Sequence, residues 1–116
     1  MSQKNVGMMI RLVLTTFPNS VQARQTARQL VQARLAACGT LLPGAISIYT
    51  WDGNLEENRE CLLLLKTTAD CVERLQVEIQ RMHPYDVPEI LSFEADFCLA
   101  AYAVWIKQSC TQSEGG

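Results

Sequence analysis

Residues 81–90, RMHPYDVPEI, bring together side chains that could do chemistry. Among them is His83, the only histidine of the chain, with Met82 directly before it. Imidazole and thioether groups are ligands that copper accepts, so the pair raises the question of a metal site. A stable copper site needs about three or four ligands in a fixed arrangement. One chain offers His83 with Met82 beside it and no paired cysteine, so other ligands would have to come from neighbouring copies.

The same segment also has a structural interpretation. Pro84 disfavours helix at His83, so a preceding helix has to end there. Pro88 has the same effect on Val87 and keeps the following chain extended. A histidine at a helix C-terminus also interacts favourably with the helix dipole. Tyr85 would then pack on a sheet with its hydroxyl hydrogen-bonded. Both interpretations stay open at the level of the sequence.

Composition limits the classes of protein that fit. The 116 residues are expected to form a single domain, 1–116, and 10 basic against 12 acidic side chains give a net charge of −2. No basic block is present, so nucleic acid is not an expected partner. Residues 1–14 have no small-residue cleavage site and an apolar run interrupted by Arg11, which indicates a strand and neither a signal peptide nor a membrane span. Five scattered cysteines indicate reduced thiols in a cytoplasmic protein.

Strand and helix patterns alternate in the first half of the chain. Residues 8–16 are a continuous apolar run of strand length. Asn19 with Gln22 predicts a capping box, and apolar residues at helical spacing continue the helix to Leu35. Residues 38–42 are a short apolar stretch, and Pro43-Gly44 is predicted to separate it from a strand over 45–51.

The second half begins with a turn. Asp52-Gly53 predicts a tight hairpin, because both residues tolerate positive φ, and the return strand runs to about residue 67. Asp70 with Glu73 predicts a second capping box. The apolar stripe of the helix that follows consists of Val72, Leu75, Ile79 and Met82. Residues 89–95 and 99–107 are predicted as a last strand and a short closing helix, and the tail 109–116 is expected to be frayed.

The order β-α-β-β-α-β with an added helix predicts an α+β, ferredoxin-like sandwich with a core of about residues 8–108. Both helices then pack on one face of an antiparallel sheet, and the open face should be polar. It is not, because Leu62 and Leu64 alternate with the apolar residues between them. The long hairpin also leaves unpaired edge groups. We therefore expect an obligate oligomer that associates through sheet faces and hairpin edges.

Four stretches in this order resemble the CutA family of divalent-cation tolerance proteins: RLAACGTLLPGAISIYTWDGNLEE, LLLLKTT, HPYDVPEI and YAVWIKQS. The resemblance covers roughly residues 10–108. It implies a ferredoxin-like subunit in a tight homotrimer, similar in architecture to the PII signalling proteins. It also implies a cytoplasmic protein linked to tolerance of copper and other divalent metals, so copper or another divalent cation is the cofactor to consider.

In trimers with the PII-like arrangement, clefts between subunits hold small ligands. Such pockets combine an aromatic wall with a few placed polar groups. The residues expected to line a cleft here are Trp51, Glu60, Lys66, His83, Tyr85 and Glu89. Two alternatives stay open: Trp51 as interface packing, and a surface ion pair between Glu60 and Lys66.

Enzyme classes find no support. The chain has no Ser-His-Asp pattern, no Gly-rich phosphate loop and one histidine to serve as a base. With enzymes set aside, the resemblance implies a homotrimeric binding or signalling protein linked to divalent-metal tolerance, with copper or another divalent cation as its expected ligand. The alternative is a trimeric small-ligand sensor or scaffold whose metal link is indirect. An unknown protein partner also stays open.

Overall fold

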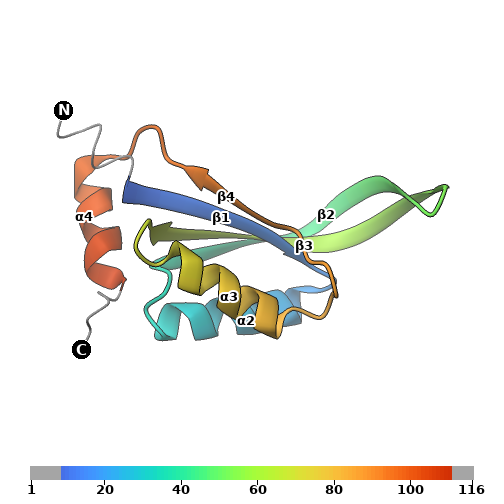
Figure 1. Cartoon of the computed structure of the whole chain (residues 1–116), viewed down its shortest axis with the longest axis horizontal. Helices are drawn as coiled ribbons and strands as arrows, with labels where there is room; N and C mark the ends of the chain where they lie inside the picture. The colour runs from blue at the N-terminus through green and yellow to red at the C-terminus, as the bar shows by residue number, and fades with distance from the viewer. Residues whose placement is uncertain (1–8, 111–116) are drawn as a thin grey trace.

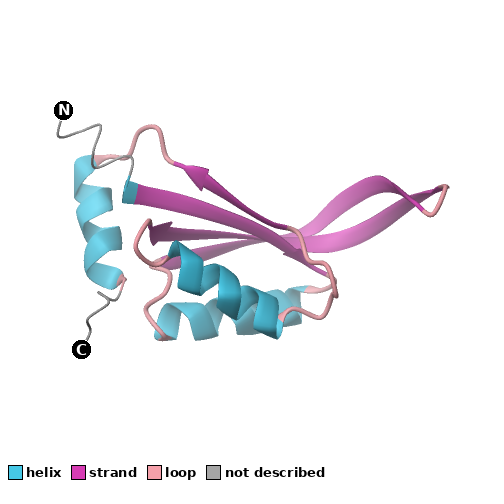
Figure 2. Cartoon of the chain, viewed as in Figure 1, coloured by secondary structure: helices cyan, strands magenta, loops and turns pink. Residues whose placement is uncertain are grey.

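A computed structural model describes residues 9–110, and its strands and helices follow the predicted order (Figure 1). The elements are β1 (Ile10–Phe17), α2 (Ser20–Gln32), β2 (Cys38–Trp51), β3 (Asn54–Thr68), α3 (Val72–Met82), β4 (Ile90–Glu94) and α4 (Ala100–Ser109). The strands form one antiparallel sheet in the order β2-β3-β1-β4. Helices α2 and α3 cover one face of the sheet, and α4 lies at its end (Figure 2). The predicted ferredoxin-like α+β class is confirmed.

Helix α2 begins as predicted and ends earlier than predicted. The Asn19 side chain accepts a hydrogen bond from the backbone N–H of Gln22 at 2.9 Å, which caps the helix. The helix stops because Arg34 takes a left-handed φ of 64°. The N–H of Leu35 then bonds back to the carbonyl of Leu30 at 3.0 Å, which closes the helix end. Leu35 therefore lies beyond the end of the helix, and its side chain is still buried in the core.

The predicted break at Pro43-Gly44 is wrong, because β2 is one strand. A bulge between Leu42 and Ala45 absorbs the irregularity, and Gly44 supplies the positive φ of 82° that the bulge needs. The hairpin turn is confirmed, since Asp52 and Gly53 have φ values of 55° and 80°. The hairpin projects beyond the helices, and the molecule is 48 Å long (Figure 1).

Two boundaries in the second half also differ from prediction. The second capping box is wrong: Cys71 is the N-cap of α3, and no side chain caps it. A turn bond from the N–H of Cys71 to the carbonyl of Thr68, 3.1 Å long, precedes the helix, so the N-cap lies one residue after Asp70 and the helix begins at Val72. At the C-terminal end, α4 includes Ser109 and Cys110 is buried, so the expected frayed tail does not begin at 109. Residues 111–116, like Met8 of the predicted first strand, lie outside the described part of the chain.

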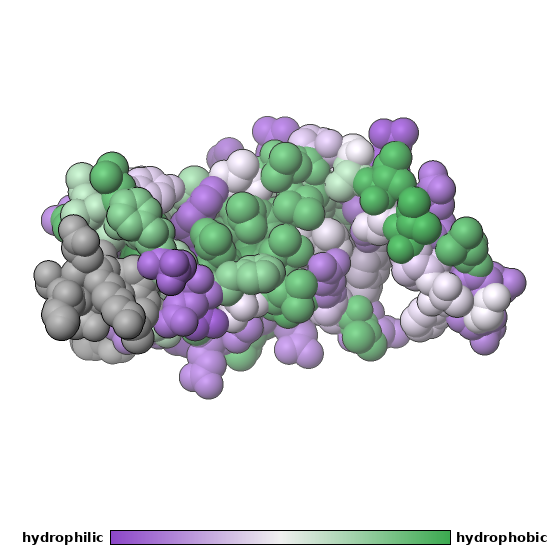
Figure 3. Space-filling view, turned by 90° about the horizontal axis from the view of Figure 1, so that it is seen from above, coloured by the Kyte–Doolittle hydropathy of each residue, from purple (hydrophilic) through white to green (hydrophobic). Residues whose placement is uncertain are grey.

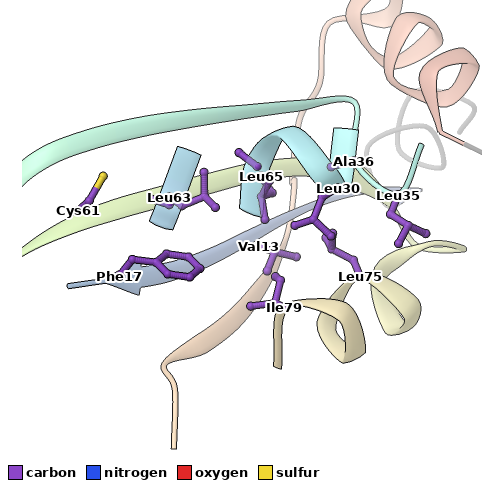
Figure 4. Packing of buried hydrophobic residues seen from close by; sticks show 12 residues of the cluster. Val13, Phe17, Leu30, Leu35, Ala36, Cys61, Leu63, Leu65, Leu75 and Ile79 are labelled. Atoms are coloured by element: carbon purple, nitrogen blue, oxygen red, sulfur yellow. The ribbon is translucent and has the colours of Figure 1, made fainter. Parts of the chain in front are cut away.

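The main core lies between the sheet and helices α2 and α3 (Figure 4). Its largest fully buried side chains come from both layers, and they include Phe17, Leu30, Leu63, Leu65, Leu75 and Ile79. A second cluster lies under α4 and contains Ile10, Ala37, Cys71, Ala103, Ile106 and Cys110. Three of the five cysteines are thus buried, as expected for small apolar side chains.

The face of the sheet away from the helices is apolar. The strand register puts Leu14 of β1 between Leu64 of β3 and Leu91 of β4, and it puts Leu12 beside Phe93. The resulting surface, here called the open face, consists of Leu12, Leu14, Leu42, Leu62, Leu64, Leu91 and Phe93. Figure 3 shows it as a continuous hydrophobic area over the sheet. Leu91 and Phe93 are 48% and 47% exposed, so the face has no cover within residues 9–110. None of the helices described here is long and apolar enough to cross a membrane.

Candidate functional site

A cleft of about 1180 Å³ runs along the hairpin, from Trp51 near its tip to the end of β1 and the segment 84–89. It contains aromatic and acidic side chains in close succession. Its lining residues are Thr16, Ser47, Ile48, Tyr49, Trp51, Glu56, Glu60, Pro84, Tyr85, Asp86, Val87 and Glu89. The chain reaches this shape because α3 ends at Met82, with His83 as its C-cap, and the irregular segment after it passes the end of β1 before β4 begins (Figure 1).

The structure brings together four of the side chains that the sequence pointed to: Trp51, Glu60, Tyr85 and Glu89. Lys66 is not among them. Its ammonium group lies 2.5 Å from Oγ1 of Thr40 and 3.8 Å from Sγ of Cys38, at the other end of β3. Six residues of strand separate Lys66 from Glu60, which corresponds to roughly 20 Å. Lys66 therefore does not line this cleft of the single chain, and its expected position in a cleft between subunits stays a prediction. The alternative of an ion pair with Glu60 within one chain is wrong, because the two side chains lie at different ends of β3.

Glu60 is held in place from two sides. The hydroxyl of Ser47 donates to its Oε1 at 2.7 Å, and the hydroxyl of Tyr85 donates to its Oε2 at 3.1 Å. Burial, followed by this hydrogen bond and the Glu60 charge, raises the pKa of Tyr85 to about 12. The Tyr85 hydroxyl therefore stays protonated near neutral pH and remains a donor. These bonds fasten the segment 84–89 to the hairpin across the cleft.

His83 does not line the cleft of the single chain, and its side chain is buried, with 8% of its surface exposed. Its Nδ1 accepts from the backbone N–H of Tyr85 at 3.1 Å, so the ring proton resides on Nε2, which donates to the carbonyl of Thr16 at 2.7 Å. The ring stacks on Phe17 with centroids 4.3 Å apart. Both nitrogens are thus engaged within the chain. A metal bound to His83 would have to displace one of these hydrogen bonds.

Met82 faces elsewhere and does not join His83 in a ligand set. It lines the groove between α2 and α3, on the helix side of the sheet. Within residues 9–110 no group of three or more His, Cys, Asp or Glu side chains could hold a metal ion. The residues of one chain therefore do not fit a copper site built on His83 and Met82.

Comparison with known proteins places the chain in a family. The profile of the CutA1 divalent ion tolerance protein family matches residues 11–109. The chain belongs to the CutA family. A divalent-cation tolerance protein CutA from Thermus thermophilus is 40% identical over 101 residues, which cover 87% of this chain and 98% of that one. A CutA from Pectobacterium atrosepticum is 38% identical over 98 residues, covering 84% and 89% of the two chains.

Solved CutA structures have the same fold. The divalent ion tolerance protein CutA1 from Ehrlichia chaffeensis superimposes with a TM-score of 0.87 at 30% identity. The match covers 90% of this chain and 98% of the other. The chain therefore has the CutA fold over nearly its whole described length.

Three further cleft residues of this CutA-family chain could contact a ligand and were not predicted from the sequence: Tyr49, Glu56 and Asp86. A signal for two of them was present. Side chains two residues apart on a strand share a face, so Tyr49 accompanies Trp51, and Glu56 lies four residues from Glu60 on the same face. Cross-strand pairing sets Tyr49 directly opposite Glu56. Asp86 lies in a segment without regular structure, where no such periodicity exists.

The protonation of His83 is expected to make stability depend on pH. Burial is the main cause of its lowered pKa, which stands below the ordinary 6.5 although the Thr16 carbonyl and the Glu60 charge oppose the shift. The folded chain then prefers the neutral ring. The free energy of unfolding should be constant above the unfolded pKa, fall as the pH decreases through 6.5, and level off below the folded pKa.

Urea unfolding between pH 8 and pH 5, at fixed protein concentration, measures this effect. His83 is the only histidine, so one imidazole signal in an NMR titration reports the folded pKa directly. The His83→Gln variant should lose the pH-dependent step. Wild-type stability that does not change over this range, or a folded pKa at or above 6.5, would contradict the interpretation.

Proposed function

We propose that this CutA-family chain is a homotrimeric, PII-like protein of the cytoplasm that binds or signals and does not catalyse. The observation that carries the proposal is the open face, an apolar sheet surface that nothing in residues 9–110 covers. Large exposed apolar patches generally mark interfaces. Copies of the same chain are the occupants we propose, because the face and the projecting hairpin edges are present on each of them.

The cleft is the proposed binding site for a small ligand. It contains aromatic side chains and several polar groups, and Glu60 is already oriented by two hydrogen bonds. Pockets with this composition are typical ligand sites. The cleft lies next to the open face. Its lining residues Thr16 and Glu60 point to the same side of the sheet as Leu14 and Leu62, because side chains two residues apart on a strand share a face. Association through the open face would therefore bring a neighbouring subunit close to the cleft.

Divalent-metal tolerance is the cellular role that we propose from family membership. Direct coordination of copper or another divalent cation by His83, with Met82 beside it, stays a prediction. The hydrogen bonds of His83 and the separate location of Met82 weigh against it in one chain. They favour the alternative in which the trimer senses another ligand and its link to metals is indirect. The five scattered cysteines are compatible with the reducing cytoplasm.

Two measurements on reduced, tag-free protein test the proposal. Light scattering during gel filtration should give three times the 13.0 kDa mass of one chain. Calorimetric titration with Cu(I), Cu(II) and Zn(II) should then be compared with His83→Gln. Tight binding that disappears in the variant would assign the metal to His83, whereas weak or unaltered binding would support the indirect link. A monomer at micromolar concentration would refute the trimer.

A further inference from the structure

The charge of the cleft points to the class of its ligand. Four carboxylates line it, Glu56, Glu60, Asp86 and Glu89, and its lining contains no lysine, arginine or histidine. Clefts whose charges have one sign concentrate ions of the opposite sign. An anionic ligand such as a nucleotide would meet repulsion here. The ligand should therefore be a cation.

Aromatic side chains narrow the class further. Tyr49, Trp51 and Tyr85 line the same cleft, and Trp51 is 69% exposed, so its ring can be reached by a ligand. Aromatic faces attract organic ammonium ions, and Trp is the most effective of them. A strongly hydrated inorganic ion gains little from such a surface, because it retains its water. The combination of aromatic rings with carboxylates favours an amine.

The spacing of the carboxylates decides between a compact and an extended cation. No group of three or more acidic, His or Cys side chains in residues 9–110 converges closely enough to hold a metal ion. A single point charge could therefore contact only part of the acidic lining. Ile48 and Val87 lie among the same lining residues and offer apolar surface for methylene groups. A chain of methylenes with an ammonium group at each end satisfies both features.

We infer that the cleft binds an aliphatic polyamine, with ammonium groups on Glu60 and on a second carboxylate and its methylenes against Trp51 and Val87. The inference rests on the proposed role of the cleft as a ligand site. Glu60 is suited to this role, because each carboxylate oxygen accepts one intramolecular hydrogen bond and retains capacity for another donor. Ser47 and Tyr85 hold the carboxylate in position before the ligand arrives.

Calorimetry with spermidine as the probe tests the inference, on wild type and on charge variants. Glu60→Gln removes the charge with little change of shape and should weaken spermidine binding roughly tenfold or more. Glu89→Gln, on an exposed residue, should weaken it as well and does not risk the fold. Glu57→Gln is the matched control, because Glu57 lies on the same strand as Glu60 but points to the opposite face and does not line the cleft. Its affinity should equal that of wild type.

Competition with magnesium chloride separates an extended organic cation from a compact divalent one. Spermidine binding that survives an equal concentration of Mg²⁺, and that weakens in both cleft variants, supports the inference. No binding at millimolar spermidine, equal loss in Glu57→Gln, or complete displacement by Mg²⁺ overturns it. The proposed function can fail separately from this inference. A trimer that binds a neutral ligand in the cleft refutes only the inference of a polyamine ligand. A monomer that binds no ligand refutes the proposed function itself.

Discussion

Phe17→Ala is expected to lower the free energy of unfolding by about 3–5 kcal/mol. Phe17 is fully buried between the sheet and the helices, and it is one of the largest side chains of the core (Figure 4). The truncation leaves a cavity and also removes the surface on which the His83 ring stacks. Since domains are stable by only about 5–15 kcal/mol, most of the margin is at stake.

Urea unfolding followed by circular dichroism, at a fixed protein concentration, measures the loss. Phe17→Leu is the matched control, because it retains much of the volume and should cost roughly 1.5 kcal/mol or less. The two variants should also differ at His83, whose NMR signal should shift more in the alanine variant. A loss below about 1 kcal/mol for Phe17→Ala would mean that the site collapses around the cavity and that Phe17 is not a major core residue.

Leu64→Asp is expected to convert the proposed trimer into monomers that remain folded. Leu64 lies near the centre of the open face, opposite Leu14 on β1 and Thr40 on β2. In one chain its side chain is half-buried, so the carboxylate can still reach water. In an assembled trimer an unpaired carboxylate would be buried in each copy, at a cost of several kcal/mol each.

Light scattering during gel filtration measures the mass, and circular dichroism verifies the fold. Val77→Asp is the control, because it introduces the same charge on the opposite side of the sheet. Val77 lies on α3 and is 61% exposed. The control variant should leave the mass unchanged. A Leu64→Asp protein that keeps the wild-type mass would show that copies do not associate through this face.

Much of the cleft could be predicted from local signals. The Asp52-Gly53 turn places Trp51 at the tip of the hairpin, and the alternation of strand side chains puts it on the same face as Tyr49. Pro84 ends the preceding helix and keeps Tyr85 and Glu89 outside regular structure, although residues 84–87 bend where extended chain was predicted. Each of these signals depends on the conformation of a few consecutive residues, so the sequence contains it.

Other features of the cleft could not be predicted, because they depend on residues distant in sequence. Lys66 and Glu60 share a strand face, and the register of β3 decides their neighbours: Lys66 lies between Leu12 and Cys38, whereas Glu60 lies opposite Ala45. The role of His83 depends on the carbonyl of Thr16, 67 positions away along the chain, which takes up one ring nitrogen. No pattern around residue 83 contains that contact.

The sequence by itself determined the order of the elements, the cap at Asn19, the hairpin turn and the apolar open face, because propensity, capping and side-chain periodicity act over a few residues. Only the tertiary structure decided that β2 runs unbroken through a bulge, that both His83 nitrogens are occupied, and that the acidic and aromatic side chains meet in one cleft. These outcomes depend on strand register and on the packing of α3 against the sheet, which join segments that are far apart in the chain.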